Sequence, residues 1–114
     1  MANTGTYITE VHLQQYDNGK ELIFELTNNG LVEAINGAIV KLKLKEVNSG
    51  HEIKRRCTIT DAELAICEYI MTSEDTAIPG EYISEVEIEY ANGRISSCPN
   101  PFKLIISKEV ISRY

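Results

Sequence analysis

The most reactive side chains in this sequence belong to three cysteines and two histidines. Cysteine thiolates and histidine nitrogens are the usual zinc ligands, and both residue types also serve as catalytic groups. Local zinc motifs such as C-x-x-C are missing from the sequence. We therefore predict free, mostly buried thiols in a protein that folds in a reducing compartment, with one disulfide between two sheets as the alternative. The five residues are Cys57, Cys67, Cys98, His12 and His51.

Motifs of the common enzyme classes are absent. The sequence contains no G-x-S-x-G, P-loop, H-E-x-x-H or G-x-G-x-x-G. His12 and His51 lie far apart along the chain and are interpreted as surface residues. Glu85, Glu87 and Glu89 share one face of a predicted strand, which is typical of a solvated face; an acid–base pair needs two different environments. We expect no catalytic residue, no cofactor and no metal, and predict that the protein is not an enzyme.

Charged residues are unevenly distributed along the chain, whose net charge is −6. Residues 41–56 carry six cations against two carboxylates, a balance of +4, whereas residues 57–93 carry nine carboxylates and no lysine or arginine. One interpretation is that the two segments form neighbouring strands with cross-strand ion pairs. The other is that the basic segment docks on an acidic partner surface. An anionic polymer is a weaker third candidate, since no aromatic residues are interleaved with the cations. The candidate contact residues are Lys41, Lys43, Lys45, Lys54, Arg55 and Arg56.

The elements that position these residues are predicted to be short strands. Four of the seven glycines follow asparagine, a pair that favours tight turns because both residues tolerate positive φ. Between the turns, apolar and polar residues alternate with a period near two, which marks strands with one buried face. We predict an all-β, antiparallel, immunoglobulin-like β-sandwich of seven to eight strands, with a small barrel as the alternative. The expected strands are 6–13, 20–27, 38–47, 51–60, 65–71, 81–90, 94–98 and 102–111.

Two hairpins and two local features complete the predicted fold. We expect a hairpin turn at Asn92-Gly93 and another at Ser49-Gly50. Residues 72–75 are expected to form one helical turn capped by the Thr72 hydroxyl. Tyr82 follows Pro79-Gly80 and is interpreted either as a hydrogen-bonding tyrosine corner or as a plain core residue.

Length and composition limit the class of protein. The 114 residues, of which 43% are hydrophobic, fit a single domain over residues 1–114. We expect residues 1–5 to form a flexible arm and residues 108–114 to begin a connection to a missing C-terminal region. The acidic balance argues against nucleic-acid binding, and no apolar run approaches the roughly 18 residues of a membrane span. The polar N-terminus does not match a signal peptide.

Six segments follow one another in an order of turns and strands that is typical of a known family: residues 19–26, 38–44, 59–71, Ile78-Pro79-Gly80-Glu81-Tyr82, residues 86–97 and Pro101-Phe102. This order resembles the N-terminal immunoglobulin-like domain of the baseplate upper proteins, the receptor-binding-protein scaffolds of phages and prophages of Gram-positive bacteria. The likeness covers roughly residues 15–107, and it departs from the family pattern at Ala65, where glycine is expected, and in the proline-free loop 28–36.

The resemblance implies a structural role in a virion tail. It implies that the domain links the baseplate core to receptor-binding proteins, binds other tail proteins, and forms a homo-oligomer that is a trimer in the family. It also implies synthesis in the bacterial cytoplasm and no catalytic residues. The alternative from another class is a cell-surface adhesin or carbohydrate-binding sandwich, with loops near Tyr7, Tyr16 or Tyr69 as the contact sites.

Overall fold

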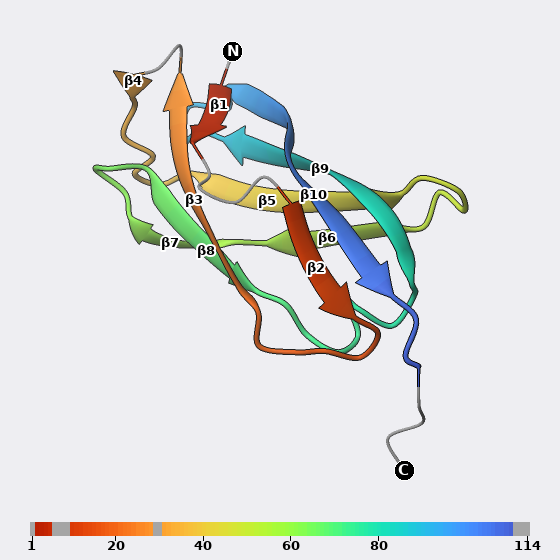
Figure 1. The fold of residues 1–114 in the computed structure, drawn as a ribbon. Helices are drawn as coiled ribbons and strands as arrows, with labels where there is room; N and C mark the ends of the chain where they lie inside the picture. Colours follow the sequence, from red (N-terminus) through yellow and green to blue (C-terminus); the bar gives the residue numbers. More distant parts are fainter. Residues whose placement is uncertain (1, 6–9, 29–30, 111–114) are drawn as a thin grey trace.

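The computed structural model describes residues 2–5, 10–28 and 31–110, which form two five-stranded sheets packed face to face (Figure 1). The described part of the chain holds no helix that could cross a membrane. The first sheet contains β1 (Ala2–Gly5), β3 (Glu21–Asn28), β4 (Leu31–Val32), β7 (Thr58–Asp61) and β8 (Ile66–Ile70). The second sheet contains β2 (Glu10–Gln14), β5 (Ile39–Glu46), β6 (Glu52–Arg56), β9 (Gly80–Glu89) and β10 (Ile95–Ser107).

The strand order confirms the immunoglobulin-like β-sandwich. The first sheet has the order β1-β3-β8-β7, with β4 added to β3, and the second has the order β2-β10-β9-β5-β6. An immunoglobulin sandwich divides its strands in the same way, with A, B, E and D in one sheet and the G-F-C group in the other. Seven of the eight strand pairings are antiparallel, as predicted. The exception is β2, which runs parallel to β10.

The structure has ten strands where seven to eight were predicted. Residues 94–98 and 102–111 were expected to be separate strands, but β10 is continuous, with a register shift between Pro99 and Lys103. Residues 2–5, expected to be an arm, form β1 antiparallel to β3. The expected first strand over 6–13 lies partly outside the described residues and is observed as β2.

The predicted strand 51–60 is divided between the two sheets. β6 pairs with β5 in the second sheet, whereas β7 pairs with β8 in the first. The crossing occurs at Cys57, which is buried and whose N–H donates to the Val40 carbonyl at 2.8 Å. Because this bond satisfies the backbone at the crossing, the chain changes sheets without leaving a buried donor unpaired. One continuous edge therefore belongs to both sheets.

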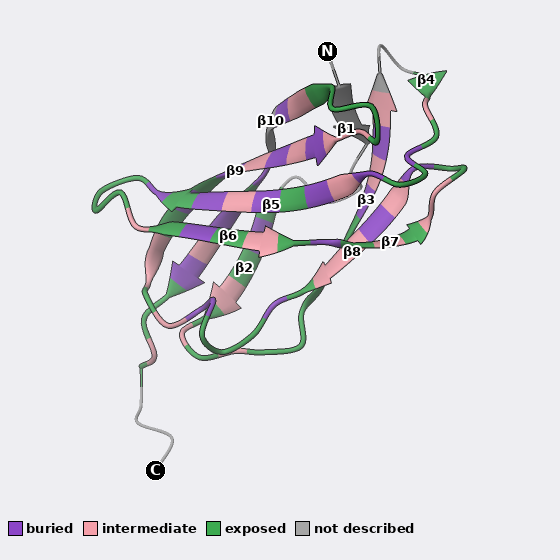
Figure 2. Ribbon diagram, turned by 180° about the vertical axis from the view of Figure 1, so that it is seen from behind, coloured by how far each residue is buried: buried purple, intermediate pink, exposed green. Residues whose placement is uncertain are grey.

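The core is built from the predicted alternation. Along β5 and β9, purple buried positions alternate with pink and green ones in Figure 2. Phe24 of the first sheet stacks on Phe102 of the second, with ring centroids 5.8 Å apart. Tyr82, Leu42 and Leu104 are also fully buried between the sheets. Burial of each large apolar side chain contributes about 1.5–3 kcal/mol to folding.

Both predicted hairpins are confirmed. β9 and β10 pair across the Asn92-Gly93 turn, where Gly93 has a φ of +88°. β5 and β6 pair across Ser49-Gly50, where Gly50 has a φ of +76°. These positive φ values explain why glycine occupies the turns.

The Tyr82 hydroxyl donates to the Ile78 carbonyl at 2.7 Å, so the hydrogen-bonding tyrosine corner is confirmed. Gly80, which precedes it, has a φ of +149°, and a Cβ there would lie 2.6 Å from Glu46 Cγ. Gly80 therefore permits both the backbone conformation and the close approach of the buried Glu46.

Residues 72–75 form a hydrogen-bonded turn and no regular helix. The predicted cap is present: the Asp75 N–H donates to the Thr72 hydroxyl at 3.3 Å. The Asp75 carboxylate in turn accepts from the Thr72 N–H at 2.9 Å. This reciprocal pair has the pattern of a capping box, and it fixes the direction of the Asp75 side chain.

Candidate functional site

The three cysteines are free thiols, and all three are buried. Cys57 and Cys67 are hydrogen-bonded to each other, and this bond together with burial raises the pKa of the Cys67 thiol. A raised pKa disfavours the thiolate, which is the nucleophilic and metal-binding form. Across residues 2–5, 10–28 and 31–110, no group of three or more His, Cys, Asp or Glu side chains is arranged to hold a metal ion.

The two histidines lie on different elements and have different neighbours. His12, on the outer side of β2, lies 2.6 Å from Glu10. His51, in the turn between β5 and β6, has its ring edge-on to Tyr82, with centroids 6.5 Å apart. They do not form a joint site.

The outer face of the second sheet carries opposite charges on neighbouring strands. The acidic strand β9 lies between β5 and β10 in the sheet order. Lys43 of β5 bonds Glu87 at 2.7 Å and lies 3.5 Å from Glu85, while Lys103 of β10 lies 2.7 Å from Glu81. The hydrogen bond with Lys43 lowers the pKa of Glu87, and the same bond raises the pKa of Lys43. The interpretation of cross-strand pairing therefore holds for this part of the charge pattern.

The six candidate contact cations have separate environments. Lys43 is paired as described, and Lys54 lies 3.7 Å from Glu52. Arg55 points inward to Asp75. The remaining three are exposed and have no ion pair within the described part of the chain: Lys41, Lys45 and Arg56.

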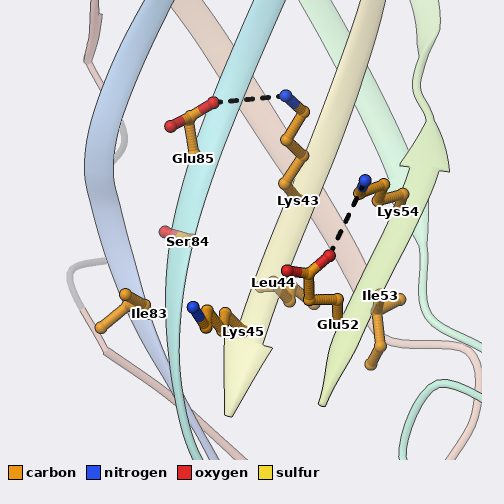
Figure 3. Close-up of a pocket in the computed structure, with 9 residues that line it drawn as sticks. All are labelled: Lys43, Leu44, Lys45, Glu52, Ile53, Lys54, Ile83, Ser84 and Glu85. Carbon is orange, nitrogen blue, oxygen red and sulfur yellow. Dashed lines mark ion pairs between the residues drawn. The ribbon is translucent and has the colours of Figure 1, made fainter. Parts of the chain in front are cut away.

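An open depression of about 370 Å³ lies beside these lysines on β5, β6 and β9. Figure 3 shows Lys43 reaching towards Glu85, while Lys45 lies beside Ile83. Ile83 is 46% exposed and provides apolar surface among the charges. The depression is open to solvent and has lysine amines at its rim. It therefore suits a side chain of a docked protein better than a small molecule, which needs a pocket that encloses most of its surface.

A buried ion cluster lies where β6, β8 and the turn at residues 72–75 meet. Asp75 is 1% exposed. Its carboxylate accepts from Arg55 Nε at 2.8 Å and from the Tyr69 hydroxyl at 2.5 Å. Arg55 belongs to β6 and Tyr69 to β8, so the cluster joins the second sheet, the first sheet and the turn at residues 72–75. In the sequence, Arg55 lies on the apolar side of its predicted strand, between Ile53 and Cys57, and this position is the local signal for an inward-pointing arginine.

The charged state of this cluster follows from its hydrogen bonds. Burial alone would raise the pKa of Asp75, but hydrogen bonds from Tyr69 and Thr72 and the charge of Arg55 outweigh it and hold the pKa below its usual value. Burial, with the adjacent Asp75, raises the pKa of Tyr69 to about 12. An ionised aspartate that is saturated with donors has a structural role, because it is poorly placed to exchange protons with a substrate.

The outer face of the first sheet is acidic and partly apolar, a feature that sequence reasoning missed. The strand register alternates carboxylates and isoleucines: Glu21 lies opposite Ile70, Ile23 opposite Glu68, and Glu25 opposite Ile66. Ile23 and Ile70 are 53% and 52% exposed. None of these three carboxylates has an ion pair with another residue that the structure describes.

Several solved structures are similar to this chain at low sequence identity. CopC from Methylosinus trichosporium OB3b is 9% identical, with a TM-score of 0.58 and full coverage of both chains. A fibronectin(III)-like module of CbhA from Clostridium thermocellum is 14% identical, with a TM-score of 0.46, covering 98% of this chain and 100% of that one. The first immunoglobulin domain of RIG-5 is 9% identical, with a TM-score of 0.46, covering 96% and 98%. The first of these supports the sandwich fold.

No curated protein sequence matches the chain significantly. The family model described as the BppU N-terminal domain matches residues 1–114, the whole chain. The chain therefore belongs to the BppU N-terminal domain family, and it is a domain of a phage baseplate protein, a component of the virion tail.

Proposed function

We propose that this domain is an attachment module that links the baseplate core to receptor-binding proteins in a phage or prophage tail. The observation that carries the proposal is the family match over all 114 residues. The chain acts by binding other tail proteins, assembles as a homo-oligomer, and catalyses no reaction. It is synthesised in the bacterial cytoplasm and then incorporated into the virion. Neither nucleic acid nor a membrane is a partner.

The distribution of polar groups supports a binding role. The buried Asp75 is saturated with hydrogen bonds, and the three thiols are buried, so the reactive groups are committed to the fold. The outer sheet faces, in contrast, carry exposed charges and exposed isoleucines. Such a combination of a rigid core and mixed polar–apolar faces is typical of protein interfaces.

Within this surface, we propose that Lys41, Lys45 and Arg56 contact an acidic protein surface. They are the exposed candidate cations without an ion pair in the described ranges. Their charges increase the rate and specificity of docking more than its final affinity, and salt screens them.

A carbohydrate-binding role has less support. Tyr69 is turned inward to Asp75, and Tyr7 lies outside the described residues. Of the three tyrosines considered, Tyr16 is the one that the structure places at the surface, at 45% exposure.

The test is co-purification of the chain with the distal tail protein and the receptor-binding protein of the same phage. We expect a complex of defined stoichiometry that persists through size-exclusion chromatography. An unrelated immunoglobulin-like domain carrying the same tag is the control. Failure to bind either tail protein, with a glycan array giving specific binding, would overturn the proposal in favour of the adhesin alternative.

A further inference from the structure

The outer face of the first sheet presents a triangle of carboxylates that form no ion pair with the described residues. Glu21 and Glu25 lie four residues apart on β3, and Glu68 of β8 lies opposite Ile23, midway between them. Four residues of an antiparallel strand span about 13 Å, and adjacent strands are about 4.8 Å apart. The described residues that contact these strands supply no ion pair to the three carboxylates. We call this set the acidic triangle.

The outer face of the second sheet presents a triangle of cations with the same spacing. Lys41 and Lys45 lie four residues apart on β5, and Lys54 of β6 lies opposite Lys43, midway between them. Among the residues that the structure describes, Lys54 has one ion pair, a 3.7 Å contact with Glu52, and both of these side chains are more than half exposed. We call this set the basic triangle.

The two triangles are geometrically complementary. Both sit on antiparallel strand pairs, so their dimensions follow the same strand repeat. In each triangle, the residue on the second strand, Glu68 or Lys54, lies opposite the middle of the side on the first strand. Each triangle therefore has mirror symmetry, and all three positions still coincide when one face is turned over and placed on the other. Three carboxylates then meet three ammonium groups.

The apolar surface at the two sites is complementary too. Ile23 lies midway between Glu21 and Glu25 on the β3 side of the acidic triangle and is about half exposed. The depression of about 370 Å³ lies at the basic triangle and is lined by Lys43, Lys45 and Ile83, among others (Figure 3). Face-to-face docking brings Ile23 to this depression, where its burial adds an apolar contribution at the centre of a charged rim.

We propose that the outer face of β3–β8 in one copy of this chain docks on the outer face of β5–β6 in a second copy. This inference rests on the proposed assembly of the domain as a homo-oligomer, and it names an acidic surface for Lys41 and Lys45, two of the three cations of that proposal. Contact of the acidic triangle with itself is disfavoured, since it would oppose like charges. The contact is therefore head-to-tail, and each copy keeps one free face of each kind, so repeated contacts build a ring or a row.

Charge reversal tests the proposal directly. The variant E21K/E68K makes the first face basic, and K41E/K54E makes the second face acidic. We expect each variant to be monomeric by sedimentation analysis under conditions in which the wild-type chain associates at low salt. Their equimolar mixture should associate again, because each acidic face then meets a basic one. Association of the wild type and of the mixture should weaken at high salt.

The control variant K103E/K108E changes the net charge as much as K41E/K54E does, but outside the basic triangle, and it should associate like the wild type. A wild-type chain that stays monomeric at low salt, or a mixture that stays monomeric, would overturn the inference. Co-purification with the tail proteins is measured on the same samples. If the tail proteins still bind while the mixture stays monomeric, this contact is wrong and the attachment function stands.

Discussion

Two ion clusters in different regions of the molecule each pair a cation with carboxylates, but one is buried and the other is exposed to solvent. Arg55, Asp75 and Tyr69 meet where the side chain of Asp75 is fully buried. Lys43 contacts Glu85 and Glu87 on the outer face of the second sheet, where all three side chains are partly exposed. The carboxylate of Asp75 is fully buried although Arg55 is 35% exposed, so loss of a partner inside this cluster leaves a group that water cannot fully compensate, whereas water can replace either partner of an exposed pair. Burial, more than distance, therefore determines which cluster the fold depends on.

The largest expected effect is that of Asp75→Ala. Removal of the carboxylate leaves the Arg55 guanidinium and the Tyr69 hydroxyl without their shared acceptor. We expect a loss of about 3–5 kcal/mol in the free energy of unfolding, measured by urea titration. The double variant D75A/R55M should recover part of it, because it removes the unpaired charge. A loss below about 1 kcal/mol would place the buried cluster in the same class as the exposed one.

The second-largest expected effect is the loss of stability at acidic pH as the buried Asp75 becomes protonated. The folded pKa of Asp75 is below its unfolded value, so its contribution is fully present above an unfolded pKa of about 3.9 and is lost as the pH falls through the folded pKa. We expect stability, followed by urea titration at several pH values, to fall more steeply below about pH 4 in the wild type than in Asp75→Asn. Equal slopes in the two proteins would contradict the ionised state of Asp75.

The hydrogen bonds of two tyrosine hydroxyls differ in whether the acceptor is charged or neutral. Tyr69 donates to the Asp75 carboxylate, and Tyr82 donates to the Ile78 carbonyl. We expect Tyr69→Phe to cost about 1.5–3 kcal/mol and Tyr82→Phe about 0.5–1.5 kcal/mol in the free energy of unfolding. If Tyr82→Phe lowers the free energy of unfolding more than Tyr69→Phe does, the hydrogen bond of the tyrosine corner stabilises the fold more than the hydrogen bond to Asp75.

The smallest expected effect is that of Lys43→Met on the outer face. The variant removes both ion pairs of this lysine, yet we expect a change below about 1 kcal/mol, and a smaller one at high salt. Thermal unfolding at low and high salt is the measurement. A salt-independent loss would mean that Lys43 stabilises the fold by packing of its aliphatic stem and not by its charge.

Sequence reasoning succeeded where structure is local. The alternation of Val40, Leu42 and Leu44 with lysines predicted the buried and exposed faces of β5, and glycine placement predicted both hairpins. The position of Tyr82 after Pro79-Gly80 gave the tyrosine corner as one of two interpretations. These features depend on neighbouring residues along the chain.

The features that sequence reasoning missed depend on contacts distant in sequence. The apolar side of the predicted strand 51–60 is interrupted at Arg55 but resumes at Cys57, so the alternation does not mark Cys57 as the crossing between sheets. Arg55 and Asp75 are 20 residues apart, and their pairing depends on the turn that directs Asp75 inward. The acidic triangle arises only because β3 pairs with β8 in one particular register.

The parallel pairing of β2 with β10 has a mechanical consequence. The register runs from Glu10 opposite Lys103 to Gln14 opposite Ser107, so the first strand of the second sheet and the last strand of the chain lie side by side and point the same way. Tension that pulls the start of β2 away from the end of β10 acts along both strands. All the hydrogen bonds of the pair then share the load in shear, and none can be opened singly from one end. The β2–β10 pair therefore resists a force applied between the start of β2 and the end of β10.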